Sequence, residues 1–235
     1  MKDINDWQSK FESCTYSERL INKLVLLNTT ANIPVDIQEI KKAIFYAKKY
    51  HADQKRKSGE LYYSHPLEVA YMVSDYNFKT DVIVASILHD VVEDTEMTAG
   101  MVLDIFGRRV EEMVDRLTRD RPDGSKLSVE EILKNAFKTQ DKEVILIKVI
   151  DRLHNIMTLE FIPKSKQEKM FSETLDSFMI PAIHYGYNDI EKQIWQLYCD
   201  YKLINFKSLE FKDSKFIRDT PSVLSQAYQN AKYPK

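Results

Sequence analysis

Residues 81–95 of this chain read DVIVASILHDVVEDT, and the interpretation of the whole sequence starts from them. Positions 82 to 88 are apolar except for one serine. A helix here would be apolar around most of its circumference and would lie in the centre of the protein. We expect a single helix over residues 81–92. Its end carries four ionisable side chains, which need a charged partner or a bound metal ion when they are buried: His89, Asp90, Glu93 and Asp94.

The rest of the chain also predicts helices. Residues 36–49 place apolar side chains at i, i+3, i+4 and i+7, which is the pattern of an amphipathic helix. Residues 142–159 form a second apolar run; its β-branched side chains would also suit a buried strand, but its length favours a helix. With only 5 glycines and 7 prolines in 235 residues, the sequence predicts an all-α fold. Further helices are expected over residues 65–73, 98–106, 108–119, 166–180 and 188–203.

The composition argues against several classes of protein. Hydrophobic residues make up 43% of the chain, which favours a packed globule over disorder. A formal net charge of -2 argues against a general partner of nucleic acid or membrane surfaces. The N-terminus lacks a secretory signal, and no apolar run approaches the roughly 20 residues that span a bilayer. Cys14 and Cys199 fit no zinc or redox spacing, so we expect free thiols and a cytoplasmic protein.

Charged residues interrupt the second apolar run as well. Asp151 and Asn155 are spaced i, i+4, so they share a helix face, where a carboxylate ligand would have a neutral hydrogen-bonding group beside it. His65 stands where a polar loop meets a helix. Taken alone, each element also fits a capping or surface role. Together they supply two imidazoles and two carboxylates, a donor set typical of a catalytic divalent ion: His65, His89, Asp90 and Asp151.

No thiolate joins this donor set, which argues against a structural zinc site. Mn²⁺ is the ion that the ligand types favour, while Fe²⁺ and Zn²⁺ stay open. Glu93 and Asp94 follow Asp90 by three and four positions and return to its face of a helix. The sequence therefore predicts a second acidic pair facing the water bound to the ion.

Three stretches resemble the hydrolase domain of the RelA/SpoT alarmone enzymes. They are residues 51–66 (HADQKRKSGELYYSHP), 88–95 (LHDVVEDT) and 151–155 (DRLHN). The resemblance extends over about residues 36–159, and a weaker likeness continues through residues 173–184. It implies an HD-domain helical bundle with a C-terminal helical extension. We expect no synthetase region, so the resemblance also implies a stand-alone hydrolase.

The resemblance implies a reaction and a role for each matching residue. The reaction is hydrolysis of guanosine 3′-diphosphate 5′-di- or triphosphate at the 3′ position, with release of pyrophosphate. The family's Mn²⁺ ligands match His65, His89, Asp90 and Asp151. Its catalytic acidic pair matches Glu93 and Asp94. Its contacts with the nucleotide match Arg56, Lys57, Ser58, Asn155 and Thr158.

The resemblance also organises the chain into four parts. We expect an N-terminal helical segment over residues 1–35 and the HD hydrolase core over residues 36–163. Helices of residues 164–211 would pack on that core, and residues 212–235 would form a tail.

The chain departs from the family pattern at three positions. Asp53 replaces a usual glycine, which would alter the loop backbone or place negative charge near the phosphates. Leu61 replaces a usual proline, so the loop would be less rigid. Met157 stands where a basic residue is common, which removes a partner for a phosphate. These departures bear on substrate affinity more than on the chemistry.

Two other functions stay open. One is an HD-type phosphohydrolase for another nucleotide, such as the 2′-phosphate of NADPH, a deoxynucleotide or a nucleoside monophosphate. The other is a catalytically silent nucleotide-binding regulator, for which Glu93 and Asp94 would be superfluous. The basic loop at Arg56 and Lys57 would also suit a solvated surface loop. For His154 we expect a structural role or a role beside the metal ligands.

Overall fold

The computed structural model describes residues 6–121 and 123–210, with side chains as far as residue 204. Within these residues the chain has no strand, and two isolated bridges pair Lys55 with Leu61 and Asp120 with Lys126. The predicted all-α fold is confirmed. The helices are α1 Thr15–Asn28, α2 Ile37–His51, α3 Ser64–Val73, α4 Thr80–Leu88, α5 Val91–Asp94, α6 Ala99–Phe106, α7 Arg108–Leu117, α8 Val129–Lys138, α9 Lys142–Met157, the 3₁₀ helix η1 Leu159–Phe161, α10 Lys164–Ser177, α11 Met179–His184 and α12 Asn188–Glu210.

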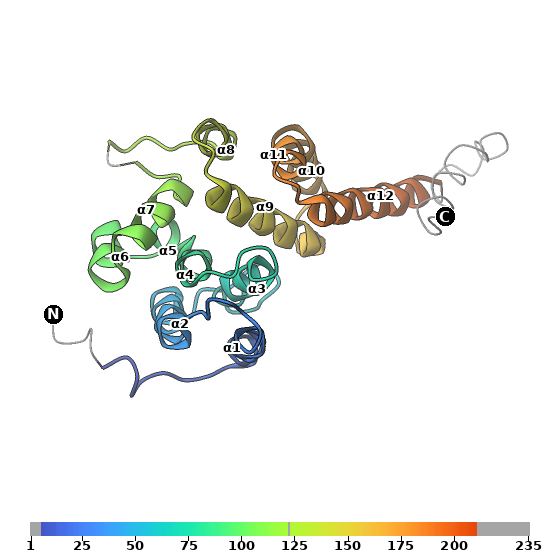
Figure 1. Cartoon of the computed structure of the whole chain (residues 1–235). Helices are drawn as coiled ribbons and strands as arrows, with labels where there is room; N and C mark the ends of the chain where they lie inside the picture. Colours follow the sequence, from blue (N-terminus) through green and yellow to red (C-terminus); the bar gives the residue numbers. More distant parts are fainter. Residues whose placement is uncertain (1–5, 122, 211–235) are drawn as a thin grey trace. The chain divides into compact units, whose positions relative to one another are not determined.

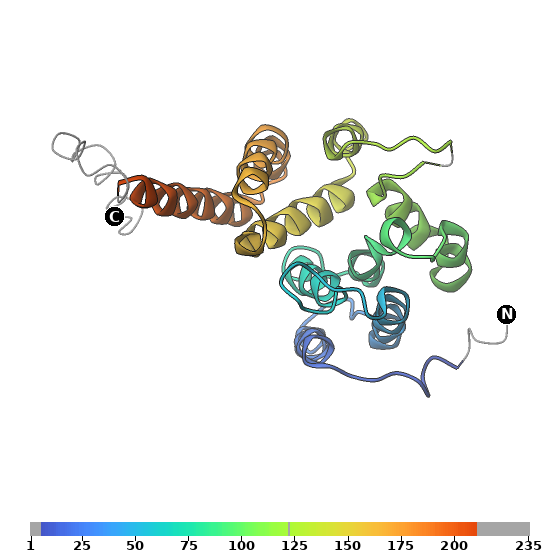
Figure 2. The ribbon, with the colours of Figure 1, turned by 180° about the vertical axis from the view of Figure 1, so that it is seen from behind.

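The chain divides into two compact units, with the boundary between residues 194 and 195 inside α12. Every site residue described below belongs to the first unit. In that unit α4 lies between α2 and α3 on one side and α7 on the other, as both views of the ribbon show (Figures 1 and 2). Helix α9 packs on α3 and α7, and on α8, α10 and α11. None of the described helices is both long and apolar enough to cross a membrane.

Helices α4 and α9 form the centre of this unit because their apolar side chains are buried. Every α4 residue from Val82 to Leu88 is buried, and so is every α9 residue from Val144 to Ile150. A fully buried aliphatic side chain contributes roughly 1.5–3 kcal/mol to stability. The two helices are therefore firmly placed, and so are the polar residues that follow these runs.

The predicted single helix over residues 81–92 is wrong, because the structure breaks it after Leu88. His89 ends α4, and Asp90 is the N-cap of the single-turn helix α5. In a continuous helix, neighbouring side chains diverge by about 100°. At the break the side chains of His89 and Asp90 instead approach each other, and Nε2 of His89 lies 3.1 Å from Oδ2 of Asp90.

Other boundaries also differ from the expectation. The helix predicted over residues 166–180 is two helices, α10 and α11, which meet at Phe178. Helix α8 was not predicted, although Ser128 and Glu131 form a capping box at its start. The tail expected over residues 212–235 lies outside the described residues.

A tight loop between α2 and α3 carries the basic residues. Arg56 N donates to the carbonyl oxygen of Glu60 at 2.8 Å, and Gly59 N donates to that of Arg56 at 2.9 Å. Gly59 has a φ of +89°, a conformation that a side chain rarely tolerates. Tyr62 N donates to the carbonyl oxygen of Gln54 at 2.8 Å, which closes the base of the loop. The loop thus fixes the backbone position of Arg56, nine residues before His65, the first candidate metal ligand in the chain.

Candidate active site

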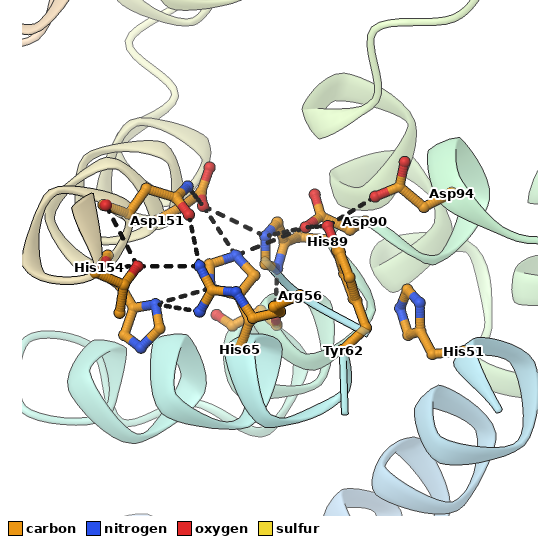
Figure 3. Close-up of polar contacts among 12 residues, drawn as sticks. His51, Arg56, Tyr62, His65, His89, Asp90, Asp94, Asp151 and His154 are labelled. Atoms are coloured by element: carbon orange, nitrogen blue, oxygen red, sulfur yellow. Dashed lines mark hydrogen bonds and ion pairs between the residues drawn. The ribbon is translucent and has the colours of Figure 1, made fainter. Parts of the chain in front are cut away.

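Four side chains from three parts of the chain meet at one point beside α4 (Figure 3). Nε2 of His65 lies 3.1 Å from Oδ1 of Asp151 and 3.6 Å from Oδ2 of Asp90. Nε2 of His89 lies 3.1 Å from Oδ2 of Asp90 and 3.8 Å from Oδ1 of Asp151. Ligand atoms of His65, His89 and Asp151 all lie within 4.8 Å of one another. The structure therefore brings together the four residues predicted as metal ligands.

The environment of His89 fits a bound cation. Its Nδ1 lies 2.8 Å from the carbonyl oxygen of Ser86, which can only accept, so Nδ1 carries a proton. Its Nε2 is buried and has no hydrogen-bond partner, although two carboxylates surround it. Burying this nitrogen between two carboxylates is costly unless a proton or a cation at the same place offsets their negative charge. These donors fit a divalent ion, which His65, His89, Asp90 and Asp151 would hold.

The charges in the cluster favour a cation in the same way. Burial disfavours a charged His89, but Asp90 and Asp151 outweigh it and raise the pKa of His89 to about 10. Burial also disfavours a charged Asp151, yet His65 and His89 hold the pKa of this carboxyl well below its usual range. The carboxylates are thus ionised and attract positive charge, which a proton or a metal ion supplies.

Tyr62 connects the metal-ligand cluster to the second acidic pair. Its hydroxyl lies 2.7 Å from Oδ2 of Asp94 and 3.0 Å from Oδ2 of Asp90. Burial, together with the two carboxylates, raises the pKa of Tyr62 far above its ordinary value, so the hydroxyl keeps its proton and donates. Its ring stacks on that of His51 with centroids 4.6 Å apart. Asp94 is therefore held beside the cluster.

Glu93 points to a different set of partners. Its Oε2 accepts from the backbone N–H of Arg119 at 3.2 Å, and its Oε1 lies 3.4 Å from Nζ of Lys126. Both partners belong to the segment between α7 and α8. Glu93 and Asp94 nevertheless line one cavity with the candidate ligands His65, Asp90 and Asp151.

Arg56 contacts α9 through both terminal nitrogens. Nη1 lies 3.3 Å from Nδ1 of His154, and Nη2 donates to Oδ1 of Asn155 at 3.1 Å and to Oγ1 of Thr158 at 3.2 Å. Asn155 donates in turn to Oδ1 of Asp151 at 2.7 Å, as its i, i+4 spacing predicted. Three residues predicted to contact substrate are thus joined to one another and to a candidate metal ligand.

Comparison with known proteins agrees with this geometry. The HD domain profile matches residues 43–180, more than half of the chain. The chain belongs to the HD domain family. The chain is 30% identical over 191 positions to a probable guanosine-3′,5′-bis(diphosphate) 3′-pyrophosphohydrolase of Mycoplasma genitalium. The chain is also 36% identical over 201 positions to a GTP pyrophosphokinase of Myxococcus xanthus.

The name of the first of these relatives agrees with the resemblance that the sequence motifs indicate. The alignments cover 77% and 79% of this chain but 26% and 27% of the relatives, so the chain spans about a quarter of their length. A solved structure described as a metazoan ortholog of SpoT that hydrolyzes ppGpp matches with a TM-score of 0.59 and 22% identity. That match covers 73% of this chain and 98% of the other, and it shows a shared fold.

The cavity of the HD domain has a volume of about 590 Å³, within the usual range for small-molecule sites. All five residues predicted to contact the nucleotide line it. They are Arg56, Lys57, Ser58, Asn155 and Thr158. Their role in binding stays a prediction.

None of the three departures from the family pattern lines this cavity. Asp53 is exposed and lines a second hollow, which Glu93 and Asp94 also line. The positive φ of +41° in this loop falls on Ala52, so Asp53 causes no such strain. Leu61 and Met157 are exposed on the surface.

The sequence pattern did not indicate two of the cavity residues, Arg119 and Lys148. Arg119 was expected at the end of the helix over residues 108–119 but follows α7, which ends at Leu117, and no local signal connects it to Glu93. Lys148 is buried and lines the cavity three positions before Asp151, where a charge within an apolar run was a usable signal. Arg152 contacts Glu173 at 3.5 Å and lies over the ring of Phe178, so it joins α9 to α10 and to the residue between α10 and α11.

Proposed function

We propose that this chain hydrolyses guanosine 3′,5′-bis(diphosphate), and the corresponding pentaphosphate, at the 3′ position, releasing pyrophosphate and GDP or GTP. One observation carries the proposal. Three members of the metal-ligand cluster, His65, Asp90 and Asp151, line one cavity with Glu93 and Asp94 and with the basic side chains of Arg56, Lys57 and Lys148. The printed names of relatives such as the Mycoplasma genitalium protein support this substrate.

Mn²⁺ is the proposed metal, because two imidazoles with two carboxylates suit it by ligand type. A bound divalent ion would polarise a phosphoryl oxygen and lower the pKa of a bound water. The metal-ligand cluster supports this assignment because its acidic groups are ionised and a buried imidazole nitrogen lacks a partner.

The chain's own residues would orient the water and the phosphates. Asp94, whose Oδ2 accepts from Tyr62, would accept a proton from the attacking water. Water attacks the phosphorus that is joined to the 3′ oxygen, and that bond to oxygen breaks. The pyrophosphate that leaves carries the water oxygen, and the 3′ oxygen takes up a proton. Lys57 and Lys148 would offset the phosphate charge.

Product analysis tests this proposal. The protein would be stripped of metal, reloaded with Mn²⁺ and incubated separately with the alarmone tetraphosphate, NADPH and a deoxynucleoside triphosphate. We expect GDP and pyrophosphate in equal amounts from the alarmone. Orthophosphate from NADPH with no turnover of the alarmone would instead identify a different phosphohydrolase. Nucleotide binding without turnover of any substrate would identify a silent regulator.

We also propose that the protein acts in the cytoplasm. The thiols of Cys14 and Cys199 are free, which suits a reducing compartment.

A further inference from the structure

His154 stands between the basic loop and the metal-ligand cluster. It lies on α9 with only 8% of its surface exposed. Its Nδ1 lies 2.8 Å from Nδ1 of His65 and 3.3 Å from Nη1 of Arg56, and Figure 3 shows all three side chains meeting there. One nitrogen atom of His154 therefore faces both a guanidinium group and a candidate metal ligand.

The chemistry of the three groups fixes where the protons lie. A guanidinium group has donors and no acceptor, so Nδ1 of His154 must accept from Arg56. The single lone pair of that nitrogen is then shared between Arg56 and the closer Nδ1 of His65, which must bear a proton. The second nitrogen of a neutral His65 is then unprotonated. This atom, Nε2, is the one that lies 3.1 Å from Asp151 and 3.6 Å from Asp90.

We propose that His154 is a positioning residue for the metal centre: it accepts from Arg56 and from His65, and so holds His65 in the tautomer that offers Nε2 to a cation. The proposal rests on the metal site of the proposed function. Groups that hydrogen-bond to a ligating histidine fix its tautomer and orientation, and losing one typically weakens metal affinity by about 10- to 100-fold.

Related contacts connect the basic loop with the metal-ligand cluster. Arg56 also donates to Asn155, and Asn155 donates to Asp151, so the guanidinium supports two candidate ligands through two different side chains. Metal binding should then strengthen the anchoring of Arg56 on α9, because coupling between two sites is reciprocal.

Two substitutions of the same residue separate hydrogen bonding from packing. His154→Leu fills the space but has no acceptor. His154→Asn retains an acceptor oxygen close to the position of Nδ1. We expect the Mn²⁺ affinity, measured by equilibrium dialysis with detection of free Mn²⁺, to fall by about 10- to 100-fold in His154→Leu. His154→Asn should restore most of that loss.

Arg56→Met removes the donor and leaves His154 in place. Its loss of Mn²⁺ affinity should be smaller than that of His154→Leu. Adding Arg56→Met to His154→Leu should increase the loss less than the two single losses predict, because part of the guanidinium's effect passes through His154. Full additivity would contradict that connection.

Nitrogen NMR of the imidazole rings gives a readout that does not depend on any variant folding. In the wild-type protein we expect the proton of His154 on Nε2, both without metal and with Zn²⁺, and the proton of His65 on Nδ1 with Zn²⁺. A proton on Nδ1 of His154, or wild-type Mn²⁺ affinity in folded His154→Leu, would overturn the inference. A wild-type protein that binds no metal would overturn the proposed function instead. In that case the tautomer of His154 would still test whether its Nδ1 accepts from Arg56 and His65.

Discussion

The hydroxyl of Tyr62 lies 2.7 Å from Oδ2 of Asp94, and this contact ties the proposed proton acceptor to the edge of the metal-ligand cluster. The same hydroxyl reaches Asp90 at 3.0 Å, so a single donor serves both a candidate ligand and a candidate catalytic group. Asp94 itself is exposed, and the bond from Tyr62 restricts the orientations of its carboxylate.

Tyr62→Phe should lower kcat by about 10- to 100-fold, because a misplaced catalytic group can cost about 100-fold. The ring that stacks on His51 is retained, so folding and metal content should not change. Steady-state kinetics with metal analysis checks both. Tyr63→Phe is the matched control, since Tyr63 does not line the metal cavity. Equal losses in the two variants would mean that the bond to Asp94 has no special role.

Glu93→Gln and Asp94→Asn should each lower turnover strongly and preserve nucleotide binding. Both changes conserve shape and remove the carboxylate, and general acid–base catalysis typically contributes about 100- to 10,000-fold. Asp94→Asn should show the larger effect, because the carboxylate of Glu93 already has partners in Arg119 and Lys126. Binding of the alarmone to each variant is measured by calorimetry, and turnover by chromatography. Undiminished turnover in Asp94→Asn would remove its assigned role.

Asp151→Ala should lose the metal, because Asp151 approaches both imidazoles and accepts from Asn155. The protein should remain folded, since the apolar part of α9 is unchanged. Metal content after dialysis measures the outcome, and Asp53→Ala, in the exposed loop, serves as the control. Stoichiometric metal in Asp151→Ala would show that the ligand assignment is wrong.

The stability of the metal-free protein should fall as the pH rises above neutral. Burial opposes a charge on His89, but Asp90 and Asp151 raise its pKa to about 10 from an ordinary value of about 6.5. The folded protein therefore binds this proton more tightly than the unfolded chain. That stabilisation is complete below about pH 6.5 and is lost as the pH rises through about 10.

Urea unfolding of metal-free protein over this pH window measures the effect. His89→Gln, which cannot take up the proton, should show a flatter dependence. Affinity for Mn²⁺ should rise over the same window, because the metal has to displace the proton from His89. A wild-type unfolding free energy that is constant from pH 6.5 to 10 would contradict the raised pKa.

The candidate ligands were predictable because charged residues interrupt or begin apolar runs. His89 and Asp151 follow long stretches of buried aliphatic side chains, and burial makes an unpaired charge costly. The break between α4 and α5 was not predictable, since residues 81–95 keep a helical pattern through it. The break is accompanied by a tertiary contact, in which Nε2 of His65 approaches Oδ2 of Asp90 at 3.6 Å, and a local sequence pattern does not contain such a contact.

The contacts of Arg56 were also outside the reach of local patterns. The loop was recognised as basic, but its partner His154 lies 98 positions away in the chain. The arrangement of Glu93 beside Arg119 has the same origin, because it depends on how the segment after α7 folds back. Local spacing predicts which residues share a helix face, whereas packing between helices decides which faces meet.

Hydrolysis in ¹⁸O-labelled water tests the central claim most directly. Protein loaded with Mn²⁺ would be incubated with guanosine 3′,5′-bis(diphosphate), and the products would be separated and weighed by mass spectrometry. We predict GDP without label and pyrophosphate with one labelled oxygen, in equal amounts, and no products from Asp151→Ala. Intact substrate in the presence of metal-loaded protein, or labelled orthophosphate as the product, would contradict the account.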